Sequence, residues 1–102
     1  MNSFAIRQEM ARCREETVFK SNCETVSEQN YNAAMQKLFA MNGSEPPTMR
    51  EHIRMTAQSL ATASALFGIE KSVLEAKLRK LENDLKVAEA AETAQARELG
   101  KQ

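Results

Sequence analysis

The chain has no tryptophan, one tyrosine and four phenylalanines, so aromatic residues make up only 5% of its 102 residues. Large aromatic side chains supply much of the area buried in a globular core. The core of this protein must therefore be thin, although apolar residues reach 42% of the composition. A thin core in a chain rich in glutamate, lysine, arginine, glutamine and alanine is typical of long amphipathic helices that complete their burial against a second chain.

Residues that carry out catalysis or hold metal ions are also scarce. His52 is the only histidine, and Cys13 and Cys23 lie ten residues apart without a CxxC pair. These residues are too few for a structural zinc site. The sequence also lacks a glycine-rich phosphate loop and a nucleophile elbow. We therefore expect no enzyme activity, no metal, no cofactor and no small-molecule substrate, and we expect both cysteines to be reduced thiols.

Long apolar runs are missing as well. No stretch reaches the roughly eighteen apolar residues of a membrane span, and Arg7 and Glu9 interrupt the segment where a secretory signal would be apolar. We therefore expect a cytoplasmic protein without a membrane partner. Lysine plus arginine equals aspartate plus glutamate at 14 each. Long-range attraction to nucleic acid is therefore weak, and any basic surface must be local.

The first part of the chain, residues 1–43, predicts a pair of short helices. Ser3 can cap the first helix, in which apolar or small residues recur at spacings of 4, 3 and 4. This face consists of Ile6, Met10, Cys13 and Thr17. The polar stretch 20–24 interrupts the pattern, which predicts a helix end near Phe19. Ser27 can cap the second helix, and Asn42 followed by Gly43 is a stop signal for it.

The remainder predicts a linker and a helical hairpin. Residues 44–47 end in two prolines, which fix the backbone and disfavour helix before them. Thr48 with Glu51 forms a capping box, Gly68 ends the helix that starts there, and Ser72 with Glu75 repeats the capping pattern. We therefore predict an all-α chain with a single helical domain over residues 1–102. It comprises the helical pair, the linker, and a hairpin over 48–102 that ends in a long coiled-coil-like helix.

Apolar residues in the second half follow a heptad pattern, which predicts a protein interface. They recur at alternating spacings of 3 and 4, interrupted only at Lys71. The seam consists of Phe67, Leu74, Leu78, Leu81, Leu85 and Ala88. It could close within the chain or between chains. Met35 and Met49 belong to a methionine-rich stretch around the linker. They either extend the predicted interface, since methionine suits adaptable binding surfaces, or fill gaps in the core.

Residues 59–81 resemble the helix-turn-helix of the Fis family and of many bacterial enhancer-binding regulators. The match includes small residues at 63 and 64, Gly68-Ile69, and an apolar residue at Leu74 followed by Lys77-Leu78. The resemblance implies a turn at Gly68 with positive φ and a second helix that contacts DNA. The candidate DNA-binding residues are Lys71, Ser72, Lys77, Arg79 and Lys80.

Two function hypotheses follow from the sequence. The first is a non-enzymatic helical interaction protein, such as an adaptor, a chaperone-like protein or an inhibitory subunit, whose partner is another protein or a second copy of itself. Zero net charge, a thin core and the heptad seam favour it. The alternative is a DNA-binding regulator that dimerises through its C-terminal helix.

Overall fold

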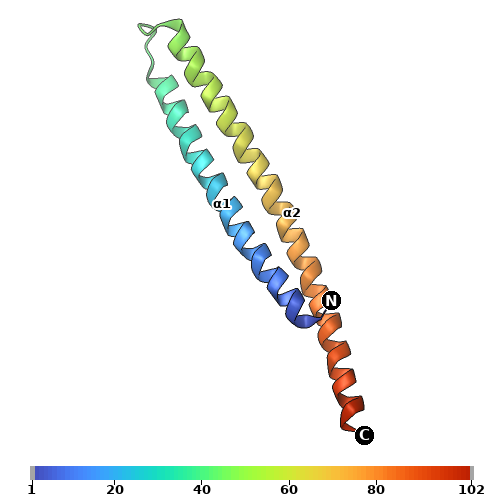
Figure 1. Cartoon of the computed structure of the whole chain (residues 1–102). Helices are drawn as coiled ribbons and strands as arrows, with labels where there is room; N and C mark the ends of the chain where they lie inside the picture. Colours follow the sequence, from blue (N-terminus) through green and yellow to red (C-terminus); the bar gives the residue numbers. More distant parts are fainter. Residues whose placement is uncertain (1, 102) are drawn as a thin grey trace. The chain divides into compact units, whose positions relative to one another are not determined.

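The computed structural model of the protein describes residues 2–101 and is almost entirely α-helical. Helix α1 spans Ser3–Ala40 and helix α2 spans Pro47–Gly100, with a short connection between them (Figure 1). The described residues contain no strand. The all-α class is therefore confirmed. The predicted number of helices is wrong, because two long helices replace the two short helices and the hairpin.

Helix α1 continues through the stretch that was expected to end it. Residues 20–24 are helical, and Ser27 is a buried residue inside α1 instead of an N-cap. The stretch contains neither glycine nor proline, and serine and asparagine lower helix propensity only modestly. The Thr25 hydroxyl donates a hydrogen bond to the Ser21 carbonyl oxygen at 3.0 Å. A hydrogen bond of this kind, from a hydroxyl to the carbonyl oxygen four residues earlier, accommodates a polar side chain within a helix.

The connection between the helices agrees with the sequence signals for a stop. Helix α1 ends at Ala40 and Gly43 has φ 90°, the left-handed conformation that glycine tolerates. The Asn42 side-chain oxygen accepts hydrogen bonds from the backbone N–H of Ser44 at 3.0 Å and from its hydroxyl at 2.6 Å. Helix α2 then starts at Pro47. Proline suits the first turn of a helix, because the N–H that it lacks would have no hydrogen-bond partner within the helix there.

Helix α2 also continues through Gly68, so the predicted hairpin within residues 48–102 is wrong. Among the described residues, Gly43 alone has a positive φ. A helical glycine costs up to about 1 kcal/mol relative to alanine, which a helix of 54 residues can absorb. The capping pattern of Ser72 and Glu75 therefore lies inside a helix and starts none.

The chain forms two compact units. Unit 1 comprises residues up to 18 together with those from 72 onward, and unit 2 comprises residues 19–71. In unit 1, Ile6, Met10 and Cys13 of α1 and Leu81 of α2 are buried and form the core cluster. Burial of the first three confirms the apolar face predicted for the N-terminal helix.

Unit 2 has a thinner interior. Its buried residues are small: Ser27 and Ala34 from α1 and Ala57 from α2. Ion pairs also join the two helices in this unit: the Lys20 ammonium lies 2.7 Å from a Glu70 carboxylate oxygen, and the Lys71 ammonium lies 3.0 Å from a Glu24 carboxylate oxygen. The Lys20 ammonium also lies 5.7 Å from the centre of the Phe67 ring. Unit 2 is therefore a two-helix layer with little apolar burial of its own.

Candidate interaction surfaces

Most of the predicted heptad seam lies in unit 1, where it packs on α1. Leu81 is buried, and four further seam residues pack, partly buried, against the core cluster: Leu74, Leu78, Leu85 and Ala88. The Cys13 thiol donates a hydrogen bond to the Leu74 carbonyl oxygen at 3.1 Å. The coiled coil therefore closes within the chain in this unit, and both cysteines are free thiols.

Polar contacts flank this seam at the start of α1. The Ser3 backbone N–H and hydroxyl donate hydrogen bonds to the two Glu92 carboxylate oxygens, at 3.0 and 2.7 Å. These bonds, the backbone one first, lower the pKa of Glu92 below its ordinary value. Arg7 forms a further ion pair with Glu89 at 2.8 Å. A carboxylate at a helix N-terminus also interacts favourably with the positive end of the helix dipole. Glu92 of α2 therefore caps the N-terminus of α1.

Glu9 and Lys77 form a second polar contact between α1 and α2 in unit 1. The Lys77 ammonium donates a hydrogen bond to a Glu9 carboxylate oxygen at 2.8 Å. This hydrogen bond and the accompanying charge attraction lower the pKa of Glu9 and raise the pKa of Lys77. Both shifts favour the charged forms, so the two groups stay charged, and the ion pair stays intact, over a wider pH range than the free side chains would.

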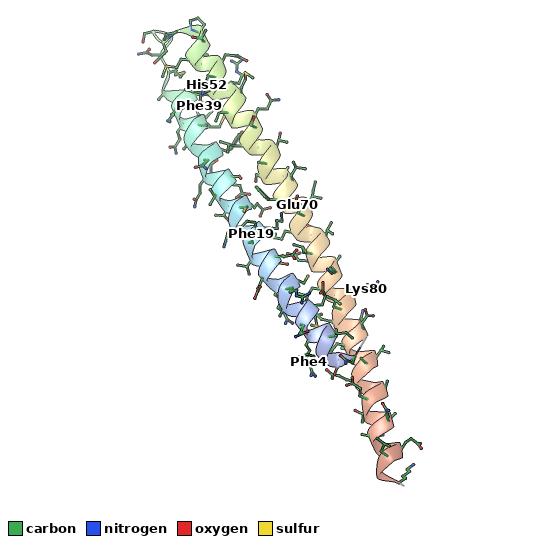
Figure 2. The ribbon with its side chains drawn as sticks, in the orientation of Figure 1. Phe4, Phe19, Phe39, His52, Glu70 and Lys80 are labelled. Atoms are coloured by element: carbon green, nitrogen blue, oxygen red, sulfur yellow. The ribbon has the colours of Figure 1, made fainter. Side chains whose placement is uncertain are left out.

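The candidate DNA-binding residues do not form one free basic surface. Lys71 is paired with Glu24 in unit 2, and Lys77 is paired with Glu9 in unit 1. Ser72, Arg79 and Lys80 are exposed, and Figure 2 shows Lys80 on the side of α2 that faces away from α1. The turn that the resemblance places at Gly68 is absent, so the two helices of a helix-turn-helix are one helix here.

The remaining predicted interface residues lie in unit 2. Phe67 is partly buried, Met35 is partly buried, and Met49 is 50% exposed. Met41 and Met49 line a shallow hollow of about 230 Å³ beside Ile53, whereas Met35 is not among its lining residues. The structure thus brings together two of the methionines around the connection.

Sequence reasoning missed an apolar surface on the outer face of α2 in unit 2. Met55, Leu66 and Ile69 are 59%, 54% and 61% exposed. With Ser59 and Thr62 they recur at spacings of 4, 3, 4 and 3, which places them on one side of the helix. We call these five residues the α2 outer face. The spacing was readable in the sequence, but the stronger leucine seam on the same helix obscured it.

A second missed surface is a trough along one side of unit 2, made of two hollows. Phe19, Cys23, Val26 and Phe67 line the first, of about 440 Å³. Both apolar and polar residues line the second, of about 430 Å³, including Ala33, Ala34, Leu60, Lys37 and His52. The α1 side of the trough again shows heptad spacing: Phe19, Cys23, Val26, Asn30, Ala33 and Lys37.

The described residues, 2–101, lack two further kinds of site. No group of three or more histidine, cysteine, aspartate or glutamate side chains is placed to hold a metal ion. Neither α1 nor α2 has a stretch long and apolar enough to cross a membrane. No protein family, curated protein or solved structure matches the chain at a significant level.

Proposed function

We propose that the protein is a non-enzymatic helical interaction module, of the adaptor, chaperone-like or inhibitory-subunit kind, that binds another protein through the α2 outer face. The observation that carries the proposal is the exposure of Met55, Leu66 and Ile69, each by more than half. Single exposed apolar residues are ordinary, but an aligned group on one helix face is characteristic of an interaction site.

The chemistry of this face suits a protein groove. Recognition of a helix by a groove uses apolar anchors spaced three, four and seven residues apart. Leu66 and Ile69 supply one such pair, and Thr62 and Met55 continue the face about one and three turns before Leu66. The α2 outer face carries no charged residue, so its burial would leave no unpaired charge. The DNA-binding alternative has no comparable observation in its favour, because α2 is unbroken at Gly68.

Cross-linking of the tagged chain to its protein partner, in cells of the organism that produces it, tests the proposal. A tagged parent chain is compared with a Leu66→Lys, Ile69→Lys double variant. A matched control, Val87→Lys with Leu99→Lys, changes two exposed apolar residues of unit 1 and adds the same charge. Circular dichroism first establishes equal helicity in all three proteins.

We expect the parent and the control to cross-link to the same protein, and the face variant to lose that product. Burying two added lysines in an apolar groove should weaken binding by at least about a hundredfold. A face variant that cross-links to the same protein at the parent level would show that the α2 outer face is not the binding surface.

A further inference from the structure

We propose that Asn42 is a site of covalent self-modification, at which the Gly43 backbone nitrogen, with Glu45 as the base, converts the asparagine to aspartate and isoaspartate. Water is the co-reactant and ammonia is released. The site lies in the connection between α1 and α2, at the upper end of Figure 1. It goes beyond the proposed function and does not depend on it.

The reaction needs an asparagine whose side-chain amide carbon can be reached by the next backbone nitrogen. Glycine favours this step, because it has no Cβ to block the nitrogen and its backbone turns freely. Asn42 and Gly43 are both exposed, and Gly43 has φ 90°. Among the described residues, chain neighbours aside, no heavy atom lies within 4 Å of the position that a Gly43 Cβ would occupy. The site is therefore unhindered and open to water.

A hydrogen bond within the connection holds the two reacting groups together. The Ser44 N–H donates to Asn42 Oδ1 at 3.0 Å. The ring that this bond closes contains both Asn42 Cγ and the Gly43 nitrogen, which are the two atoms that must join. The side-chain amide of Asn42 is therefore folded back on the Gly43 peptide, as in the turns that asparagine commonly forms.

Two donors lie at the oxygen on which negative charge develops. In addition to the Ser44 N–H, the Ser44 hydroxyl donates a hydrogen bond to Asn42 Oδ1 at 2.6 Å. Attack on Cγ turns this amide oxygen into an oxyanion, and donors already in place stabilise an oxyanion more than they stabilise the carbonyl from which it forms. Ser44 therefore activates the amide of Asn42.

A proton acceptor lies at the attacking nitrogen. The Gly43 N–H donates a hydrogen bond to a Glu45 carboxylate oxygen at 3.2 Å. A general base must lie within this reach of the proton that it removes. Residues 42–45 thus supply, in consecutive positions, the amide that is attacked, the nucleophile, the donors to the oxyanion and the base.

The steps balance with water as the only co-reactant. The Gly43 nitrogen forms a bond to Asn42 Cγ, its proton passes to the Glu45 carboxylate, and Oδ1 becomes negative. The Cγ–Nδ2 bond then breaks, the proton returns from Glu45 to the leaving nitrogen, and ammonia departs from a cyclic imide. Water adds to one of the two imide carbonyl carbons and breaks its bond to the Gly43 nitrogen. One carbonyl gives aspartate, and the other gives isoaspartate.

Four other asparagines lie inside helices and serve as internal controls. In a helix each backbone N–H is bonded to the carbonyl oxygen four residues earlier, and the regular backbone holds the nitrogen away from the preceding side chain. The glycine that follows Asn42 is also missing, since these asparagines precede other residue types. They are Asn22, Asn30 and Asn32 in α1 and Asn83 in α2.

The products change the connection in two ways. Isoaspartate routes the main chain through the former side-chain carbon, which lengthens the connection by a methylene group. Both products add a negative charge. Asn42 directly follows Met41, which lines the shallow hollow with Met49 and Ile53. The modification therefore places a carboxylate at the edge of that apolar hollow.

Peptide mass spectrometry of the full chain, incubated for several weeks at neutral pH, tests the proposal. Trypsin cuts after Lys37 and Arg50, and the peptide between them has Asn42 as its only asparagine. We expect Asn42 to be largely converted while the four helical asparagines stay largely intact. Part of the product should be methylated by an isoaspartyl methyltransferase. Conversion of Asn42 no faster than that of the helical asparagines would overturn the proposal.

A Glu45→Gln variant tests the base, after circular dichroism has established that its helicity equals that of the parent. We expect its Asn42 to react about tenfold more slowly than that of the parent, a smaller factor than the roughly hundredfold effect of a positioned base in an enzyme. Glu51→Gln is the matched control, because it removes the same charge from a carboxylate that pairs with Arg54 instead. Asn42 of the Glu45→Gln variant reacting at the parent rate or faster would contradict the role of Glu45.

The same measurement in guanidinium chloride separates the effect of the fold from that of the Asn-Gly pair itself. We expect Asn42 to react at least as fast in the folded chain as in the unfolded one, whereas the helical asparagines react more slowly when folded. A folded chain in which Asn42 reacts several times more slowly than in the unfolded chain would show that the hydrogen bonds of the connection protect the amide, and the proposal would be wrong.

Discussion

At the residue scale, the Glu9–Lys77 pair ties α1 to α2 in unit 1 and makes that unit sensitive to pH. The pKa of Glu9 is lowered, so its contribution to stability is present above the ordinary carboxyl value of 4.5 and is lost as the pH falls through the lowered value. The pKa of Lys77 is raised, so its contribution is complete below the ordinary lysine value of 10.5 and is lost as the pH rises through the raised one. The pair therefore stabilises the fold between those limits.

A double-mutant cycle with Glu9→Gln and Lys77→Met measures this contribution. Urea unfolding at neutral pH and low salt should show a favourable coupling between the two residues. The coupling should disappear in acid, as the Glu9 carboxylate is protonated, and should shrink in high salt because the contact is open to solvent. A coupling that persists in strong acid would mean that the two side chains interact through something other than charge.

At the element scale, the continuity of α2 through Gly68 predicts the effect of adding a methyl group there. The added Cβ would lie 2.6 Å from a Glu24 carboxylate oxygen, the mobile end of a flexible side chain that can move aside. Alanine is favoured over glycine in a helix by up to about 1 kcal/mol. We therefore expect Gly68→Ala to raise the free energy of unfolding, by less than that full amount because Glu24 must shift.

Gly43→Ala is the control for this measurement. Gly43 has φ 90°, so a side chain there should lower the free energy of unfolding by about 1 kcal/mol or more. If Gly68→Ala destabilised the protein as strongly as Gly43→Ala, the backbone at Gly68 would be a turn, as the helix-turn-helix resemblance implies. Urea unfolding of both variants beside the parent distinguishes the two cases.

The same elements show how far the sequence could predict the fold. Helical spacing correctly predicted helices and the Ile6 and Met10 face, and the Asn42-Gly43 signal correctly predicted the stop. Capping patterns misled at Ser27 and at Ser72, because serine lowers helix propensity only modestly and can occupy a helix interior. These patterns permit a helix start without requiring one, and packing between the helices decides.

The candidate surfaces were less predictable for a related reason. Helix α2 carries two apolar stripes, one containing Leu81 and one containing Leu66, and the sequence does not state which stripe α1 will cover. The outcome depends on contacts between residues far apart in the sequence, such as that of Cys13 with Leu74 in unit 1, which are 61 positions apart. Local spacing therefore identifies the faces of each helix but does not assign their partners.

At the scale of the whole molecule, the contacts of the leucine seam decide which surfaces remain open to partners. In unit 1 the seam packs on Ile6, Met10 and Cys13 of the same chain. The surfaces left for partners are then those that α1 does not cover, including the α2 outer face and the trough of unit 2. If the seam instead joined different chains, those surfaces would lose their significance and the leucines would be the interface.

Methyl NOE spectroscopy on an isotopically diluted sample tests this claim most directly. Chains labelled at isoleucine, methionine and leucine methyl groups are mixed, after unfolding and refolding, with an excess of unlabelled chains. We predict that cross-peaks from Ile6 and Met10 to the seam, including Leu81, keep their intensity per labelled chain, because the contacts lie within one chain. Loss of these cross-peaks on dilution would show that the seam closes between chains and would contradict the account.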